Sequence, residues 1–284
     1  MKVFRFTLRA HISNGLDICI VLLGCAMLSL LASGSLFASV ANARVTTFPQ
    51  PYALAGSSTT TLQGTPTADG GCAFPPGRLT LPRAERAVEL REVGLDAQTC
   101  TATIEQGVPP ASALGQDVPA DGFGFATSSG NRAPTASAAR HVNRRPTAHA
   151  AAYAYAAGYE KDWFEDPVGI DVNKVISKVG FHYGGGCVRD ASWSGEWFWF
   201  TTSGWNLISN SNYGNVNCGQ AYSSSWGHFK NGAFCAGANV ESYYNRTVVY
   251  GSPSGGLSAT WNSYNTGAVC KSLLSFHRTL VRTS

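Results

Sequence analysis

Charged side chains are scarce in this sequence. They make up 13% of its 284 residues, and 21 basic against 17 acidic side chains give a net charge of +4. A protein that binds nucleic acid usually gathers its basic residues on one face, whereas here they are scattered except for Arg140, Arg144 and Arg145. We therefore expect no nucleic-acid partner and no general attraction to acidic polymers.

The motifs of well-known enzyme and metal sites are also missing. The sequence contains no G-x-S-x-G, H-E-x-x-H or G-x-x-x-x-G-K-[ST] pattern. A zinc site usually needs cysteines in close pairs, and after residue 43 the two closest, Cys218 and Cys235, are seventeen residues apart. We expect no bound metal and no other cofactor.

Long helical periodicity is absent from residue 151 onward. The segments there are short, rich in Val, Tyr, Phe, Trp and Thr, and separated by clusters of Gly, Asn and Ser, which is typical of β-strands. We predict that residues 151–284 form an all-β domain, built as a disulfide-stabilised antiparallel β-sandwich. A β-barrel uses the same kind of segment and remains the alternative.

The chain begins with a segment that has the features of an export signal. Its first ten residues carry three basic side chains, no charge occurs between Asp17 and Arg44, and Ala41-Asn42-Ala43 has the small-x-small pattern of a cleavage site. We predict that residues 1–43 are a signal peptide and that the protein is secreted, with no membrane association afterwards. Lipidation at Cys25 or an uncleaved anchor would instead hold it at the cell surface.

Six cysteines follow the predicted signal. An even number of cysteines in an exported chain indicates disulfides. Nearness in the sequence favours three pairs, although other pairings remain open. The favoured pairs are Cys72–Cys100, Cys187–Cys218 and Cys235–Cys270.

Composition divides the region before the β-domain into three parts. Residues 44–70 are rich in Thr, Ser, Gly and Pro, and we expect a flexible lead-in. Residues 71–108 alternate between apolar and polar on both sides of Asp96, which predicts a small disulfide-linked β-hairpin unit. This unit is too small to bury a core of its own, so it needs its disulfide or contact with the larger domain. Residues 109–150 are again rich in small and polar residues, and we expect a disordered linker.

The segment WSGEWFWFTTSGW, residues 193–205, carries six large rings in thirteen positions. We expect strands on either side of a turn at Ser194-Gly195. A strand of a two-layer sandwich normally alternates apolar and polar residues, yet the rings here occupy both parities. Either a further layer covers the second face, such as the 71–108 unit, or the rings are displayed to a ligand.

These rings favour a binding function. We expect a secreted or cell-surface, non-enzymatic binding protein whose tryptophans stack on the sugars of an extracellular polysaccharide or another cell-envelope component. In the neighbouring segment 209–221, four Asn residues could hydrogen-bond to hydroxyl groups, although Asn is also a common turn former. The predicted ligand-binding residues are Trp193, Trp197, Trp199 and Trp205.

Two other functions remain as alternatives. A secreted glycan hydrolase would use Glu196 as its acid, with a raised pKa among the rings, and a second carboxyl from the acidic residues at 160–166. A secreted toxin or bacteriocin-like protein is indicated by composition alone, in the segment 221–234. His182, His228 and His277 fall in predicted strands, where we expect ordinary structural positions.

Overall fold

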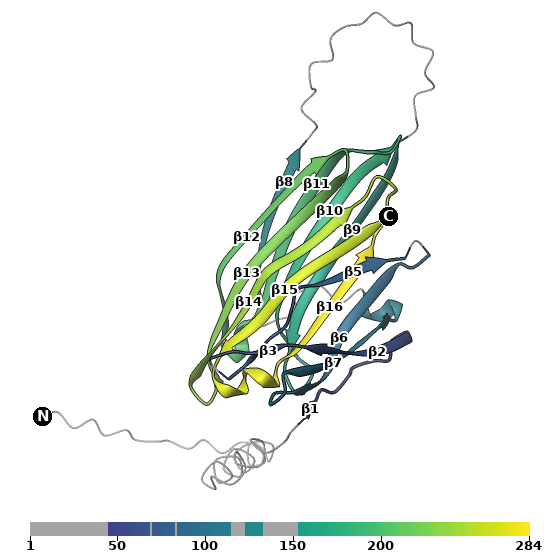
Figure 1. Cartoon of the computed structure of the whole chain (residues 1–284). Helices are drawn as coiled ribbons and strands as arrows, with labels where there is room; N and C mark the ends of the chain where they lie inside the picture. The colour runs from purple at the N-terminus through teal and green to yellow at the C-terminus, as the bar shows by residue number, and fades with distance from the viewer. Residues whose placement is uncertain (1–44, 69, 83, 115–122, 133–152) are drawn as a thin grey trace, which may run out of the picture. The chain divides into compact units, whose positions relative to one another are not determined.

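The computed structural model describes residues 45–68, 70–82, 84–114, 123–132 and 153–284, and it consists almost entirely of β-strands (Figure 1). Within these ranges the helical turns are η1 (Ala111–Ala113), η2 (Thr201–Ser203) and η3 (Val269–Leu273). In the same ranges, no helix has the length and apolar character needed to cross a membrane. The predicted signal peptide, residues 1–43, lies outside the described residues.

The larger of the two main sheets is antiparallel. Its strand order is β2-β7-β6-β16-β9-β10-β11-β8, with β1 paired to β6. Its strands are β1 (Thr46–Thr47), β2 (Ala55–Gln63), β6 (Ala87–Asp96), β7 (Thr101–Val108), β8 (Phe123–Arg132), β9 (Ala154–Glu165), β10 (Asp171–Gly184), β11 (Cys187–Phe200) and β16 (Ser275–Arg282). Strands from both ends of the described chain therefore share one sheet.

The smaller sheet has the order β12-β13-β14-β15-β5 and is also antiparallel. Its strands are β12 (Trp205–Asn217), β13 (Gln220–Cys235), β14 (Ala238–Gly251), β15 (Leu257–Gly267) and β5 (Gly77–Leu81). A separate ribbon pairs β3 (Thr65–Pro66) with β4 (Cys72–Ala73). In the part of the chain that the structure describes, neither main sheet closes on itself, so the predicted all-β sandwich is confirmed and the barrel alternative is not.

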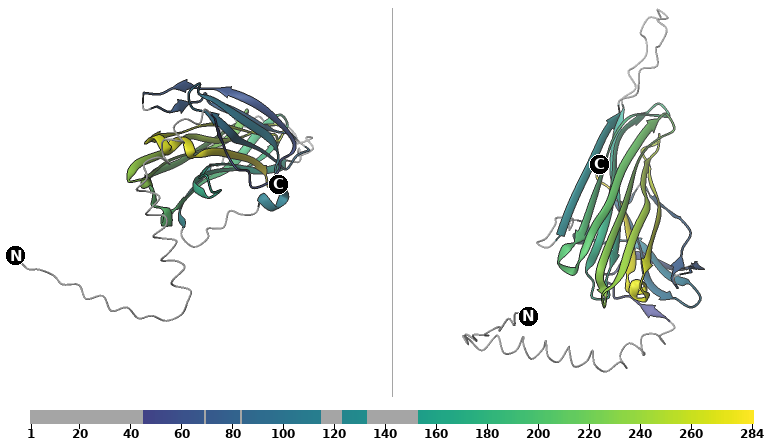
Figure 2. Two further views of the ribbon diagram at one scale, coloured as in Figure 1. Left: turned by 90° about the horizontal axis from the view of Figure 1, so that it is seen from below. Right: turned by 90° about the vertical axis from the view of Figure 1, so that its left-hand side faces the viewer.

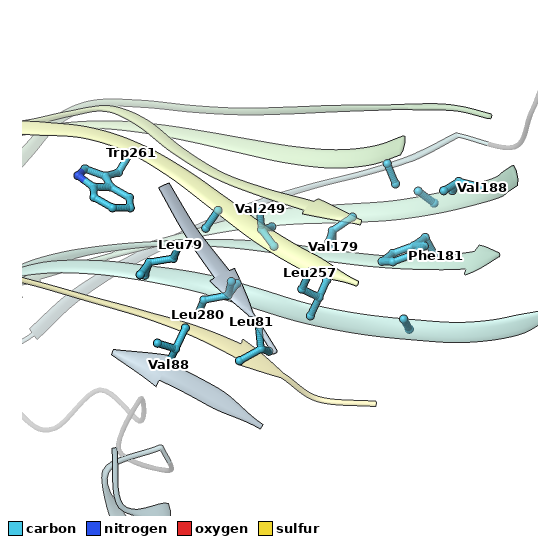
Figure 3. Close-up of a cluster of buried hydrophobic side chains, with 14 residues drawn as sticks. Leu79, Leu81, Val88, Val179, Phe181, Val188, Val249, Leu257, Trp261 and Leu280 are labelled. Carbon is cyan, nitrogen blue, oxygen red and sulfur yellow. The ribbon is translucent and has the colours of Figure 1, made fainter. Parts of the chain in front are cut away.

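The two sheets pack face to face, with β13 and β14 against β10, and β14 also against β9 (Figure 2). Buried side chains from nine strands form one cluster in this interior, and Leu79, Leu257 and Leu280 lie within it (Figure 3). A second buried cluster lies further along and includes Trp197. Removing these apolar side chains from water is the main stabilising contribution, of about 1.5–3 kcal/mol for each large residue.

The hairpin predicted within residues 71–108 forms from β6 and β7. The Asp96 side chain accepts hydrogen bonds from the backbone N–H groups of Gln98 and Thr99, at 3.0 and 3.3 Å, and so supports the turn. Strand β6 pairs directly with β16. The hairpin therefore extends the larger sheet edge to edge and does not cover the aromatic strand as a further layer.

Two segments that we expected to be flexible contain strands of the larger sheet. Strand β2 lies within residues 44–70 and β8 within residues 109–150. The side chains of β2 are small, polar and mostly exposed, and the strand is held by backbone pairing with β7. Strand β8 pairs along its whole length with β11. The rest of the expected linker, residues 115–122 and 133–150, lies outside the described residues.

The predicted turn at Ser194-Gly195 is wrong, because β11 runs through it without interruption. Gly195 faces the smaller sheet, where an added Cβ would lie 2.6 Å from the Trp197 ring and 2.8 Å from Ser225 Oγ. A side chain at this position would clash with the opposite layer. The glycine thus permits the two sheets to approach closely and does not mark a chain reversal.

Three disulfides join the pairs expected from the sequence. Cys72–Cys100 connects the ribbon to the β6–β7 turn, Cys187–Cys218 links the two sheets at the start of β11, and Cys235–Cys270 ties the end of β13 to η3. Stable disulfides indicate an oxidising compartment.

One buried carboxyl group, that of Glu92 on β6, makes stability depend on pH. Its side chain is 6% exposed and accepts a hydrogen bond from the Phe276 backbone N–H at 3.3 Å. Burial raises the pKa of Glu92 from 4.5 to about 8. Between these two values the folded protein keeps a proton that the unfolded chain releases, so a rise in pH favours unfolding.

We predict that Glu92→Gln removes this dependence. The free energy of unfolding of the variant, relative to the natural protein, should increase by a few kcal/mol between about pH 5 and about pH 8, because glutamine has no proton to lose. Urea unfolding of both proteins across this pH range measures the difference between their free energies of unfolding. Other titrating groups are the same in both proteins, so their contributions cancel in this difference. Parallel pH profiles would show that the Glu92 carboxyl is ionised at no cost in the folded state.

Candidate functional site

The four tryptophans predicted to bind a ligand do not form an exposed surface. Trp197 and Trp205 are 0% exposed, and Trp193 and Trp199 are half-buried. The Trp193 ring lies close to Gly214 of the opposite sheet, and Trp199 packs against Phe229 with ring centroids 6.5 Å apart. Trp197 and Trp205 cannot stack on a sugar while the sheets are packed together. We therefore do not propose Trp197 or Trp205 as ligand-binding residues.

The abundance of rings in β11 is explained by packing on both of its faces. On the inner face, the Trp197 indole N–H donates a 2.8 Å hydrogen bond to the Trp226 carbonyl oxygen. On the outer face, Phe198 is 5% exposed, with the Phe125 ring 4.7 Å away and the Lys174 ammonium 5.7 Å above it. Neighbouring strands of the same sheet thus cover the second face, and no separate layer is required for it.

The structure does not bring a second acid beside Glu196. Glu196 lies on the outer side of the larger sheet and forms an ion pair with a lysine of β10, whereas Glu160 and Asp162 are buried between the sheets. Glu165 lies on the same outer side but further along the sheet. Across β10, Glu196 of β11 is level with Lys161 of β9, and Glu165 is four residues beyond Lys161. This offset alone is about 13 Å along the strand. A glycosidase pair is roughly 5–10 Å apart, so these residues do not form one.

The Asn-rich segment 209–221 belongs mostly to strand β12 and not to a loop. The Asn212 side chain points inward and donates hydrogen bonds of 3.0 Å to the hydroxyl groups of Ser223 and Ser225. The Asn217 side chain accepts hydrogen bonds from the backbone of the turn into β13, including 2.8 Å from the Gly219 N–H. Both side chains have structural roles.

A set of partly exposed rings lies on the outer face of the smaller sheet. Inward positions of β13, such as Ser225 and Phe229, are buried against the larger sheet, so the alternate positions face outward. Seven ring side chains share this outward face over four adjacent strands, and we call them the tyrosine face. They are Tyr213 on β12, Tyr222, Trp226 and His228 on β13, Tyr243 and Tyr250 on β14, and Tyr264 on β15.

Three tyrosines make one row across the strands. Tyr222 and Tyr250 are direct partners in the β13–β14 ladder, with ring centroids 6.0 Å apart. Tyr213 packs against Tyr222 at 6.0 Å with ring planes 86° apart, and it is 57% exposed. Because the rings differ in tilt, the row offers both ring faces and ring edges to a molecule lying on the sheet.

The second row consists of His228, Tyr243 and Tyr264, which are in register across β13, β14 and β15. Their rings are nearly parallel, with centroid separations of 4.2 Å and 5.1 Å. Glu241 fixes the row by accepting a 2.6 Å hydrogen bond from the Tyr243 hydroxyl, and it lies 2.9 Å from His228 Nε2. The Tyr243 hydrogen bond is the main reason that the pKa of Glu241 is lowered, and the same bond raises the pKa of Tyr243 to about 12. The network therefore joins a charged carboxylate to a neutral phenol.

Trp226 and several small polar side chains lie between the two rows. Tyr222 and His228 are six residues apart on β13, so the rows are separated by about 20 Å. Outward neighbours such as Ser211, Thr260 and Asn262 carry hydroxyl and amide groups. The surface combines flat apolar rings with hydrogen-bonding groups, which suits a polyhydroxylated molecule. Its charged side chains are Lys230 and Glu241, which form an ion pair of 3.3 Å, and the arginines Arg78 and Arg246, which pair with the outward positions Thr260 and Asn262.

The sequence interpretation missed these rings because it weighed the density of aromatic residues. Each strand of the smaller sheet supplies only one to three rings of the set, next to Ser, Thr and Asn. The useful signal is the alternation of side chains along a strand. Tyr213 and Tyr222 occupy positions that face outward, whereas the residues next to them in the sequence face the interior.

Comparison with known proteins gives no further guide. No protein-family profile matches the chain, and no curated protein and no solved structure is detectably similar to it. Function must be inferred from the geometry of the molecule itself.

The core position of Trp197 leads to a prediction about stability. We expect Trp197→Ala to lower the free energy of unfolding by about 3–5 kcal/mol, because it leaves a cavity and an unpaired carbonyl group between the sheets. Tyr213→Ala, at an exposed position, should change it by less than about 0.5 kcal/mol. Urea unfolding followed by circular dichroism measures both variants. Equal stability of Trp197→Ala and the natural protein would place this indole outside the core.

Proposed function

We propose that this protein is a non-enzymatic binding protein of the cell exterior, and that its tyrosine face binds a neutral polysaccharide or another glycan of the cell envelope. The observation that carries the proposal is the gathering of seven partly exposed rings over four adjacent strands, with hydroxyl and amide side chains among them. Single exposed apolar residues are common on proteins, but contiguous sets usually mark a contact surface.

The chemistry of a sugar matches this surface in two ways. The C–H groups on one side of a pyranose ring are apolar and pack against the flat side of an aromatic ring, and the hydroxyl groups at its edge need hydrogen-bond partners. Tyrosine supplies both functions, because it has an apolar ring and a polar tip. A regular sheet also places such rings at fixed intervals along a straight face, which suits a polymer with a repeating unit.

Two further observations support an exterior location. The three disulfides are of the kind that persist in oxidising surroundings. The N-terminal sequence has the charge and cleavage pattern of an export signal. An exterior protein would meet polysaccharide as a solid phase, where several weak stacking contacts can act together.

We predict that the double variant Tyr222→Ala/Tyr250→Ala loses retention on the polysaccharide that the natural protein binds. Loss of two stacking rings should weaken binding by about fivefold to a hundredfold, at about 0.5–1.5 kcal/mol for each ring. The measurement is a sedimentation assay with insoluble cellulose, chitin, starch and isolated cell-wall material, since the polysaccharide is not identified in advance.

The matched control for this experiment is Tyr155→Ala. Tyr155 is 50% exposed but lies on β9 in the larger sheet, so its loss removes a comparable ring from outside the tyrosine face. We expect the control to sediment like the natural protein. Retention of the double variant at the natural level, or loss of retention in the control as well, would contradict binding at the tyrosine face.

A further inference from the structure

A cavity lies at the end of the sandwich beneath the β3–β4 ribbon. Its volume is about 200 Å³, and residues from β6, β15, η3 and β16 line it together with the segment 70–77. Most of its wall is apolar, with Phe74, Leu90, Ile104 and Leu274 among the lining side chains. Three ionisable groups, Glu92, Lys271 and Arg278, also line it. An apolar cavity with a few convergent polar groups is the usual form of a small-molecule site.

Arg278 is held rigidly in the wall of this cavity. Its guanidinium carbon lies 3.4 Å from the centroid of Trp261 and 3.8 Å from that of Phe276, so the group is stacked between two rings. The side chain is 1% exposed, and its Nε and Nη1 atoms have no hydrogen-bond acceptor among the described residues. A buried donor without an acceptor is costly, and an acceptor brought by a ligand would remove that cost.

Glu92 supplies a second polar group to the same cavity. One of its carboxyl oxygens accepts the Phe276 N–H, and the other, Oε1, has no partner within the described part of the chain. Because burial raises the pKa of Glu92 to about 8, this side chain carries a proton at neutral pH. It can therefore donate a hydrogen bond to an anionic ligand instead of repelling it.

Two basic side chains, Arg278 and Lys271, line the cavity. Arg278 keeps its proton at neutral pH even though burial lowers its pKa to about 9. Burial raises the pKa of the neighbouring Asp162 to about 6, a rise that the charge of Arg278 opposes. Burial and Asp162 also keep the pKa of Glu160 well above its ordinary value. Burial thus disfavours negative charge on both acids next to Arg278.

We propose that the cavity binds a small monocarboxylate with an apolar body, such as an aromatic or short-chain acid, with its carboxylate on Arg278 and Glu92. The guanidinium of Arg278 has unpartnered N–H groups on Nε and Nη1, and either of them can donate a charge-assisted hydrogen bond to a carboxylate oxygen. A dry apolar cavity of about 150 Å³ accommodates benzene, so the volume here is sufficient for one ring or a chain of a few carbons with its head group. Tyr264 of the tyrosine face also lines this cavity, but the groups that would hold the carboxylate lie on β6 and β16, so the proposal does not depend on the proposed function.

Calorimetric titration of the full chain tests this site, with benzoate and hexanoate as probes and benzyl alcohol and hexan-1-ol as their uncharged counterparts. We expect saturable binding of one acid molecule per chain, at least about tenfold tighter than the matching alcohol. Absence of binding by both acids, or equal affinity for acid and alcohol, would overturn the proposal. This comparison uses the natural protein and needs no variant.

Two variants then locate the bound acid. Arg278→Lys keeps the charge but removes the planar pair of donors, and it should weaken acid binding by at least about tenfold while leaving the alcohol unchanged. Leu90→Phe reduces the cavity volume and should weaken both. The control Tyr222→Ala/Tyr250→Ala should bind the acid normally, so a failure of this site is distinguishable from a failure of the tyrosine face. Unchanged acid affinity in Leu90→Phe would show that the acid binds elsewhere.

Discussion

The contact between the two sheets is the constraint on which the rest of the structure depends. In each long strand, alternate side chains must face the interior, and in β11 these positions include Gly195 and Trp197. The glycine allows close approach, and the indole beside it fills the space and satisfies its own N–H on the Trp226 carbonyl oxygen. Rings that are used in the core in this way are not available to a ligand.

Several features of the fold could be predicted from the sequence because their causes are local. The β6–β7 hairpin follows from alternation around the Asp96 turn, and the all-β class follows from short segments rich in β-branched and aromatic residues. The edge strands β2 and β8 could not be predicted, because backbone pairing with a distant partner holds them. Apart from Phe123 and Phe125 at the start of β8, most of their side chains are small or polar, so they look like flexible chain.

The sites were harder to predict than the fold, since both depend on register between strands. His228, Tyr243 and Tyr264 stand beside one another only because three strands align in one register, with bulges that keep the rings on one side. Glu92 and Arg278 lie far apart in the sequence, and the addition of the hairpin to the edge of β16 brings them to one cavity. The sequence prediction placed most of its candidate residues on one strand, β11, whereas the residues proposed here come from several strands.

Accessibility of the individual rings tests most directly the division between core rings and the tyrosine face. Brief hydroxyl-radical oxidation of the folded protein, read out residue by residue by mass spectrometry, measures it without any substitution. We expect ready oxidation of Tyr213, Tyr222 and Tyr250, with Trp197 and Trp205 protected until the protein unfolds, although free tryptophan reacts readily. Oxidation of Trp197 at a rate similar to that of Tyr213 in the folded protein would contradict the packing described for the two sheets.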